Sequence, residues 1–293
     1  MSKKITLLDG AVGTSLWTKA EAHGWSKDPV WQYNVAHPEI VSELTREYAE
    51  AGADIVLTNT FGVNGPVVQR FPLYTVESVL YTVESVMKNA VRLAKEAVAG
   101  TRATIALSIG PLSQLMEPWG DLSEEEVQAI YEEMIGHGMS EKPDCIILET
   151  FMDVEMMRVA AAAAKQYSVP VYCTMTFEQR GRTMMGNSVG DVIETLTPLG
   201  IDAVGMNCSL GPDLALPVIR EFREKTDLPL VFKPNAGKPV LAADGSVASA
   251  YDEAAFVREV APALELVDFV GGCCGSNVEY TRALRSYLDE QGL

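Results

Sequence analysis

Cysteine and histidine are scarce in this sequence, with five cysteines and three histidines among 293 residues. Five cysteines are too few for a disulfide framework, and the adjacent pair Cys273 and Cys274 is poorly placed to bridge itself. Metal binding is therefore the better explanation for cysteines outside the core. His23, His37 and His137 fall in predicted loops or on helix surfaces, where we expect them to be solvated rather than metal ligands.

Long apolar runs and an excess of basic charge are also absent. No segment approaches about 18 uninterrupted apolar residues, and the first apolar run is too short for a signal peptide. Acidic residues outnumber basic ones by 40 to 23, which gives a formal net charge of -17. Such a surface repels a polyanion at long range. We therefore expect a cytoplasmic protein that binds neither a membrane nor nucleic acid.

Eight short apolar or β-branched runs recur along the chain and predict buried parallel strands. They are residues 5–8, 53–57, 103–107, 144–148, 169–174, 202–206, 228–232 and 267–270. Stretches of helical period separate most of them, at residues 38–51, 124–136, 154–167, 213–225 and 252–264. This alternation predicts a single-domain (β/α)8 barrel, a TIM barrel, over residues 1–293.

An open doubly wound sheet is the alternative architecture. The first predicted strand leads into DGAVGT at residues 9–14, which lacks the full glycine spacing of a dinucleotide-binding turn. The closed barrel is therefore the favoured prediction.

One heptapeptide, LYTVESV, occurs twice in succession, at residues 73–79 and 80–86. Seven residues make about two helical turns, so a helix could accept the insertion with its apolar face nearly in register. We expect a tandem duplication without a functional role.

Polar residues follow the predicted strands, at the face where barrels of this type carry their active sites. Cys208 follows the sixth strand, and Cys273 and Cys274 follow the eighth, whereas Cys145 and Cys173 fall inside strands as expected apolar fillers. Three thiolates bind zinc strongly and leave a fourth tetrahedral position open, which is typical of catalytic sites. Buried cysteines near a turn and a redox pair are the alternative interpretations.

Several segments together resemble the homocysteine S-methyltransferase domain, which is shared by cobalamin-dependent methionine synthase, betaine-homocysteine methyltransferase and S-methylmethionine-dependent enzymes. They cover nearly the whole chain and comprise DGAVGT at 9–14, AGADI at 51–55, TNTFG at 58–62, ETF at 149–151, GMNC at 205–208, PNAG at 234–237 and GGCCG at 271–275. Residues 181–186 and 207–212 look most similar to the homocysteine-binding module of cobalamin-dependent methionine synthase.

The resemblance implies a zinc site made by Cys208, Cys273 and Cys274, with the substrate sulfur in the open position. Coordination to zinc stabilises the thiolate of an alkyl thiol that is otherwise mostly protonated at neutral pH. The implied activity is methylation of homocysteine to methionine.

The resemblance also implies a site for the two ends of an amino acid. Asp9 and Glu149 suit the ammonium group, because carboxylates form strong charge-assisted hydrogen bonds. The further expected substrate contacts are the backbone amides of Gly10, Ala11 and Val12 for the carboxylate, with Ser108 assisting, and Asn207 and Asn235, which hold either the substrate or only their loops.

The methyl donor is expected to be methylcobalamin on a separate corrinoid protein, because the chain ends at Leu293 without a corrinoid-binding module. S-methylmethionine is the main alternative donor, betaine is a second, and another thiol could replace homocysteine. A zinc-binding subunit without turnover is the non-enzymatic alternative, although a structural zinc site normally has a fourth protein ligand.

Overall fold

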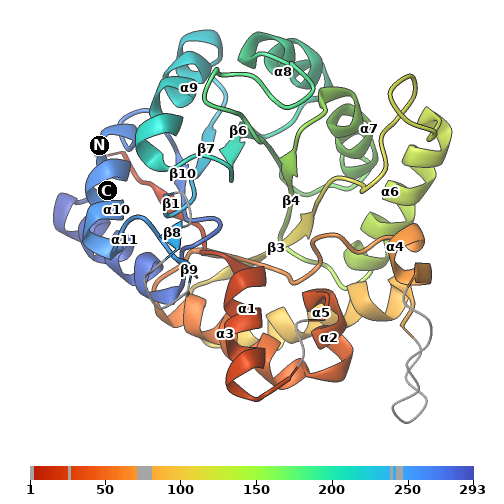
Figure 1. Ribbon diagram of the computed structural model, residues 1–293, viewed down its shortest axis with the longest axis horizontal. Coiled ribbons are helices and arrows are strands. Elements are labelled where there is room, and N and C mark those ends of the chain that lie inside the picture. Colours follow the sequence, from red (N-terminus) through yellow and green to blue (C-terminus); the bar gives the residue numbers. More distant parts are fainter. Residues whose placement is uncertain (1–2, 26–27, 71–80, 238–239, 242–246) are drawn as a thin grey trace.

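Eight parallel strands form the centre of the computed structural model, which describes residues 3–25, 28–70, 81–237, 240–241 and 247–293. Their order in the sheet is β1-β10-β7-β6-β5-β4-β3-β2. A backbone bridge between Leu8 and Ile55 links the two edges, so the sheet is nearly closed into a barrel (Figure 1). The strands are β1 (Thr6–Leu7), β2 (Ile55–Leu57), β3 (Thr104–Ile109), β4 (Cys145–Phe151), β5 (Val171–Met175), β6 (Ala203–Asn207), β7 (Leu230–Lys233) and β10 (Phe269–Val270).

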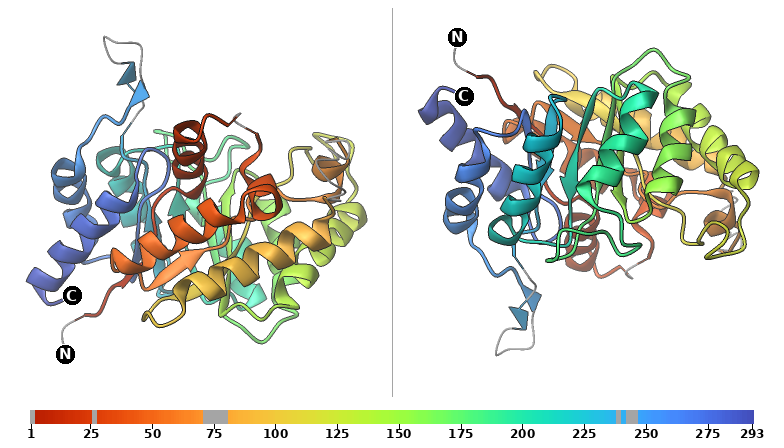
Figure 2. Two further views of the ribbon diagram at one scale, coloured as in Figure 1. Left: turned by 90° about the horizontal axis from the view of Figure 1, so that it is seen from below. Right: turned by 90° about the horizontal axis from the view of Figure 1, so that it is seen from above.

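Most helices surround the barrel as an outer ring (Figure 1), whereas α1 lies at one end of it (Figure 2). The helices of the described residues are α1 (Val12–Ala22), α2 (Tyr33–Ala36), α3 (Pro38–Glu50), α4 (Gly65–Arg70), α5 (Val83–Val98), α6 (Glu124–Met139), α7 (Val154–Ala164), α8 (Val189–Leu196), α9 (Pro212–Lys225), α10 (Glu253–Val260) and α11 (Val278–Gln291). Side-chain caps start several of them. Ser123, for example, accepts a hydrogen bond from the Glu126 amide at the start of α6, which satisfies a backbone donor that the helix leaves free.

Two sets of apolar side chains fill the two sides of the sheet, because successive side chains of a strand point to opposite faces. Ile146 and Leu148 join helix residues in the larger cluster outside the barrel. Ile147, which lies between them, belongs to a smaller cluster built from strand residues around the barrel. Cys145 lies in the inner set and Cys173 in the outer set, and both are buried, as expected of fillers.

The predicted barrel is confirmed, with two local differences from the sequence-based prediction. β4 continues beyond residue 148 to Phe151, with a register shift between Leu148 and Phe151, so Glu149 lies within the strand. An antiparallel hairpin of β8 (Val240–Leu241) and β9 (Val247–Ala248) was not anticipated. It projects from the end of the barrel where α1 lies, while the C-terminal residue lies at the opposite end (Figure 2).

The second copy of the duplicated heptapeptide, at residues 80–86, overlaps the start of α5. Residues 71–80, which include the first copy, are outside the described residues. The second copy begins the helix, because Thr82 and Ser85 form a reciprocal capping box. Among the described residues, no helix has both the length and the apolar composition needed to cross a membrane.

Candidate active site

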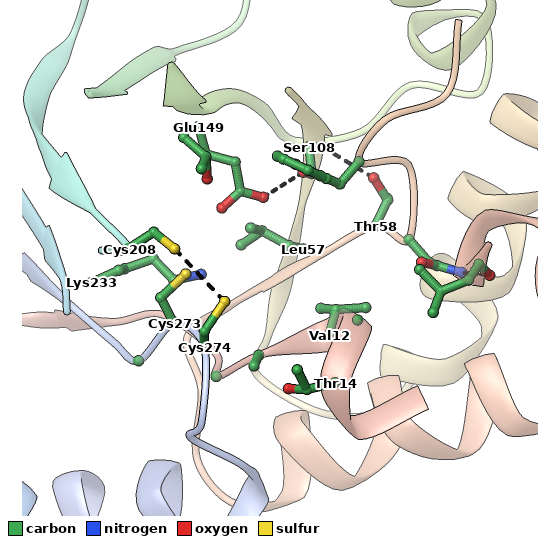
Figure 3. A pocket seen from close by; sticks show the side chains of 18 of the residues that line it. Val12, Thr14, Leu57, Thr58, Ser108, Glu149, Cys208, Lys233, Cys273 and Cys274 are labelled. Carbon is green, nitrogen blue, oxygen red and sulfur yellow. Dashed lines mark hydrogen bonds between the residues drawn. The ribbon is translucent and has the colours of Figure 1, made fainter. Parts of the chain in front are cut away.

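Three cysteine side chains meet at the end of the barrel that carries the carboxyl ends of the strands. Cys208 follows β6, and Cys273 and Cys274 follow β10. Their Sγ atoms all lie within 4.8 Å of one another, and those of Cys208 and Cys274 are 3.7 Å apart (Figure 3). A tetrahedral zinc ion with Zn–S bonds of about 2.3 Å places its sulfur ligands about 3.8 Å apart. The cluster therefore fits a zinc ion bound by three thiolates.

The turn that presents Cys273 and Cys274 depends on close backbone approach. A Cβ atom on Gly272 would lie 2.4 Å from Ser276 Oγ, and Gly275 has a φ of +82°. Ser276 Oγ donates a 2.7 Å hydrogen bond to the Cys273 carbonyl and accepts a 3.2 Å bond from the Ala11 amide. Ser276 thus connects the cysteine turn to the start of α1.

The hydrogen bonds within the cluster favour negative charge on one sulfur. Those from Cys273 and Cys274 lower the pKa of Cys208 to about 3, with a further contribution from the side chain of Asn235. The bond with Cys208 is the main cause that raises the pKa of Cys273 well above its ordinary value. One thiolate is therefore stabilised by two neighbouring thiols, and thiolate is the form that metal ions bind.

The cluster opens into a cavity of about 410 Å³, a volume typical of sites for small molecules. The lining contains two chemically distinct groups of residues. One group is polar or carries sulfur, and it includes Ser108, Glu149, Cys208, Lys233, Cys273 and Cys274. The other is apolar, and it includes the aromatic residues Trp17, Trp31 and Phe61 together with Val30 and Leu57.

Glu149 points into this cavity opposite the cysteine sulfurs (Figure 3). Its side chain is only 9% exposed, and its Oε1 accepts a 2.6 Å hydrogen bond from Ser108 Oγ. Burial raises the pKa of this carboxyl group, although Lys233 and the Ser108 bond act in the opposite direction. The two expected substrate contacts Ser108 and Glu149 are therefore hydrogen-bonded to each other.

Asn207 joins three strand ends beneath the site. Its Oδ1 accepts hydrogen bonds from the Thr150 amide at 2.8 Å and from Thr174 Oγ1 at 2.9 Å. Its Nδ2 donates to Thr150 Oγ1 at 2.7 Å and lies 3.4 Å from Glu149 Oε2. These contacts hold β4, β5 and β6 together, so Asn207 fastens the framework that positions Glu149.

Asp9 does not face the cavity, and its carboxylate is bound by the protein itself. It is fully buried, and its Oδ1 accepts a 2.8 Å hydrogen bond from Lys233 Nζ, while its Oδ2 accepts one of 2.8 Å from the Leu57 amide. Lys233 is 2% exposed and lines the cavity. Burial lowers the pKa of Lys233, but Asp9 and Glu149 outweigh this effect, so the pKa of Lys233 is raised above its ordinary value.

The turn before α1 lies against the cavity, and Gly10, Ala11 and Val12 all line it. A Cβ atom on Gly10 would lie 2.8 Å from the hydroxyl of Tyr48, which donates to the Ala11 carbonyl at 3.0 Å. The Ala11 amide is already paired with Ser276 Oγ. Asn235 is buried beside Cys208, and among the described residues its Oδ1 has no hydrogen-bond partner.

Sequence reasoning missed Lys233 and the aromatic lining. Lys233 directly follows the apolar run 228–232, where a charged residue normally marks the exposed end of a strand. Trp17 and Trp31 lie on α1 and in the segment after it, away from any strand end. Trp119 is 73% exposed and is not among the described residues that line the cavity.

Known proteins resemble this chain along most of its length. Methionine synthase of Mycobacterium leprae (strain TN) is 28% identical over 261 residues, which cover 85% of this chain and 21% of that protein. Methionine synthase of Mycobacterium tuberculosis (strain ATCC 25618 / H37Rv) is 27% identical over a match that covers 96% of this chain and 24% of that protein. Betaine-homocysteine S-methyltransferase 1 of Mus musculus is 27% identical over a match that covers 92% of this chain and 69% of that protein. The chain thus spans less than a quarter of these methionine synthases.

The fold has a solved counterpart in the metallated form of the homocysteine methyltransferase MmuM from Escherichia coli. That structure has a TM-score of 0.77 at 22% sequence identity and covers 98% of this chain and 97% of its own. A family model described as homocysteine S-methyltransferase matches residues 6–288. The match extends over almost the whole barrel, including all three clustered cysteines, and the chain therefore belongs to the homocysteine S-methyltransferase family.

Proposed function

We propose that this chain is a zinc-dependent methyltransferase that activates homocysteine, or a closely similar thiol, and methylates it at sulfur. The observation that carries the proposal is the cluster of three cysteine sulfurs, spaced for a tetrahedral ion and open to a cavity of about 410 Å³. Membership of the family supports the same reaction class.

Cys208, Cys273 and Cys274 would hold the ion from one side, which leaves the cavity side for the acceptor sulfur. When bound, zinc lowers the pKa of a coordinating thiol and so supplies a thiolate nucleophile at neutral pH. The thiol proton is lost to solvent. The sulfur electron pair forms the new bond to the methyl carbon, while the bond between that carbon and the donor breaks and its pair stays with the donor.

The surrounding side chains would orient the acceptor. Glu149 offers a carboxylate that Ser108 fixes in direction through a 2.6 Å hydrogen bond. The first turn of α1 offers backbone amides that have no partner within the helix, and Gly10 permits a close approach to that turn. An acceptor held at the first turn of α1 and at the cysteines would have its sulfur in a defined direction.

For the donor, we propose a methylcorrinoid presented by a separate protein or segment. Support comes from the methionine synthases, of which this chain matches 21% and 24%. An onium donor such as S-methylmethionine or betaine is the second candidate. Trp17, Trp31 and Phe61 favour it, because aromatic faces attract sulfonium and quaternary ammonium groups.

The test compares zinc content and methyl transfer in the wild type and in Cys274→Ser. Zinc-loaded protein would receive homocysteine with methylcobalamin, S-methylmethionine or betaine, and methionine would be measured. We expect about one zinc per chain and turnover with one donor, and a loss of turnover of at least about 100-fold in Cys274→Ser together with weaker zinc binding.

Cys145→Ala is the matched control, because Cys145 is buried in the barrel interior and outside the cluster. It should keep zinc and turnover once folded. Bound zinc without methyl transfer from any donor would instead favour a zinc-binding subunit, and full activity of Cys274→Ser would contradict the proposal.

A further inference from the structure

Asp9, Glu149 and Lys233 form a group of buried charges, each at most 9% exposed. Lys233 Nζ donates a 2.8 Å hydrogen bond to Asp9 Oδ1, and the Leu57 amide donates one of 2.8 Å to Oδ2. Both oxygens of Asp9 are thus satisfied within the protein. Lys233 and Glu149 line the cavity, whereas Asp9 is not among the described residues that do so.

An amino acid acceptor would bring an ammonium group to these carboxylates. Two carboxylates suit one ammonium, because each can accept a charge-assisted hydrogen bond from it. Here the ammonium of Lys233 already pairs with Asp9 and lies within Coulombic range of Glu149. A second ammonium at the same place would meet a buried like charge, which disfavours its binding.

We propose that Lys233 occupies the position of a substrate ammonium, so that the acceptors of this site are carboxylate-bearing thiols whose binding does not require an α-ammonium. The inference rests on the proposed function, since the acceptor sulfur must reach the cysteine cluster. Lys233 also gives the acceptor carboxylate a cation on the cavity wall. The first turn of α1 lines the same cavity and favours negative charge as well.

Calorimetric binding to the zinc-loaded protein tests this with three thiols of matched chain length. They are homocysteine, 4-mercaptobutyrate, which lacks the ammonium, and 3-aminopropane-1-thiol, which lacks the carboxylate. We expect 4-mercaptobutyrate to bind within about tenfold of homocysteine, or more tightly, and the aminothiol to bind more than about tenfold more weakly than either.

The outcomes separate this inference from the proposed function. Homocysteine binding more than about tenfold more tightly than 4-mercaptobutyrate overturns the inference but leaves thiol activation standing. An aminothiol that equals the carboxylate-bearing thiols also overturns it. If none of the three thiols binds to protein that contains zinc, the proposed function fails and the inference fails with it.

Lys233→Met provides a second, opposite expectation. Without the lysine, Asp9 and Glu149 lack a cation that a substrate ammonium can supply, so homocysteine should now bind more than about tenfold more tightly than 4-mercaptobutyrate. Lys165→Met, which removes a partly buried lysine that is paired with Asp202 and lies outside the cavity lining, should keep the wild-type order. An unchanged order in Lys233→Met contradicts the inference.

Should Lys233→Met be too unstable to purify, Asp9→Asn combined with Lys233→Met removes the two opposite charges together. That variant leaves Glu149 as the buried carboxylate, so a preference for homocysteine should still appear. The binding of the three thiols to the wild-type protein tests the inference even if neither variant can be purified.

Discussion

At the residue scale, the carboxyl group of Glu149 links the stability of the protein to pH. Burial raises its pKa above the ordinary value of 4.5, despite Lys233 and the bond from Ser108. A folded-state pKa above the unfolded one means that the folded protein binds this proton more tightly. The group therefore contributes stability below its unfolded pKa, and that contribution is lost as pH rises through the folded pKa.

Glu149→Gln should remove this dependence. With a chelator present to exclude zinc binding, we expect the variant to unfold at a higher temperature than the wild type at about pH 7, and the difference to shrink toward about pH 4. Circular dichroism during heating, at several pH values, measures this difference in unfolding temperature. Glu125→Gln on the exposed face of α6 controls for the loss of one negative charge. A difference in unfolding temperature that does not change with pH would contradict the link between the raised pKa of Glu149 and stability.

The residue scale is also where sequence reasoning was weakest. The three cysteines and Glu149 were predicted as site residues because each stands at or near a predicted strand end. Lys233 was missed because its partner Asp9 is 224 residues away, and no local pattern indicates that a lysine is buried against it. The pairing depends on the order of the strands in the sheet, which places β1 and β7 on either side of β10.

At the element scale, the ends of β4 and β6 carry strained backbone. Thr150 and Cys208 have φ angles of 65° and 64°, in the left-handed region that residues other than glycine rarely adopt. Asn207 bonds both the amide and the hydroxyl of Thr150 and directly precedes Cys208. The hydrogen bonds of one asparagine thus stabilise a backbone that aims a thiol and a carboxylate at the same cavity.

The turn between β10 and α11 provides a prediction at this scale. Gly272→Ala would place a Cβ atom against Ser276 Oγ. It would therefore displace the hydroxyl group that hydrogen-bonds both the Cys273 carbonyl and the Ala11 amide. We expect zinc affinity to fall by about tenfold or more in a chelator competition assay. Gly190→Ala in α8 is the control, since its nearest atom would be 3.5 Å away. Unchanged zinc affinity in Gly272→Ala would contradict this expectation, because the cysteine turn would then tolerate the displacement of Ser276.

Most elements were predictable because their signals are local. Apolar runs of strand length and stretches of helical period were enough to predict the barrel. The hairpin of β8 and β9 was not, because its strands have two residues each and carry no periodic pattern. The extension of β4 to Phe151 was missed because Glu149 and Thr150 interrupt its apolar run.

At the scale of the whole molecule, one end of the barrel carries the candidate site, and the other carries contacts that stabilise the fold. The cysteines, Glu149 and Lys233 lie at the carboxyl ends of the strands, where barrels of this type carry their chemistry. At the other end, Arg285 of α11 closes the seam between β1 and β2. It donates to Asp54 Oδ2 at 2.5 Å and to the Gly52 carbonyl at 3.1 Å, and Asp54 Oδ2 also accepts from the Leu7 amide at 2.8 Å.

Arg285→Met should therefore weaken the fold without changing the site. The side chain is only 14% exposed, so we expect the free energy of unfolding in urea to fall by about 1–3 kcal/mol, because charged hydrogen bonds are lost while the aliphatic stem is kept. Zinc affinity and thiol binding, measured well below the unfolding temperature, should match the wild type. Arg282→Met, which breaks an exposed pair with Glu279 on the same helix, should change neither property. A drop in zinc affinity with unchanged stability would mean instead that the seam and the cysteine cluster are coupled through the barrel.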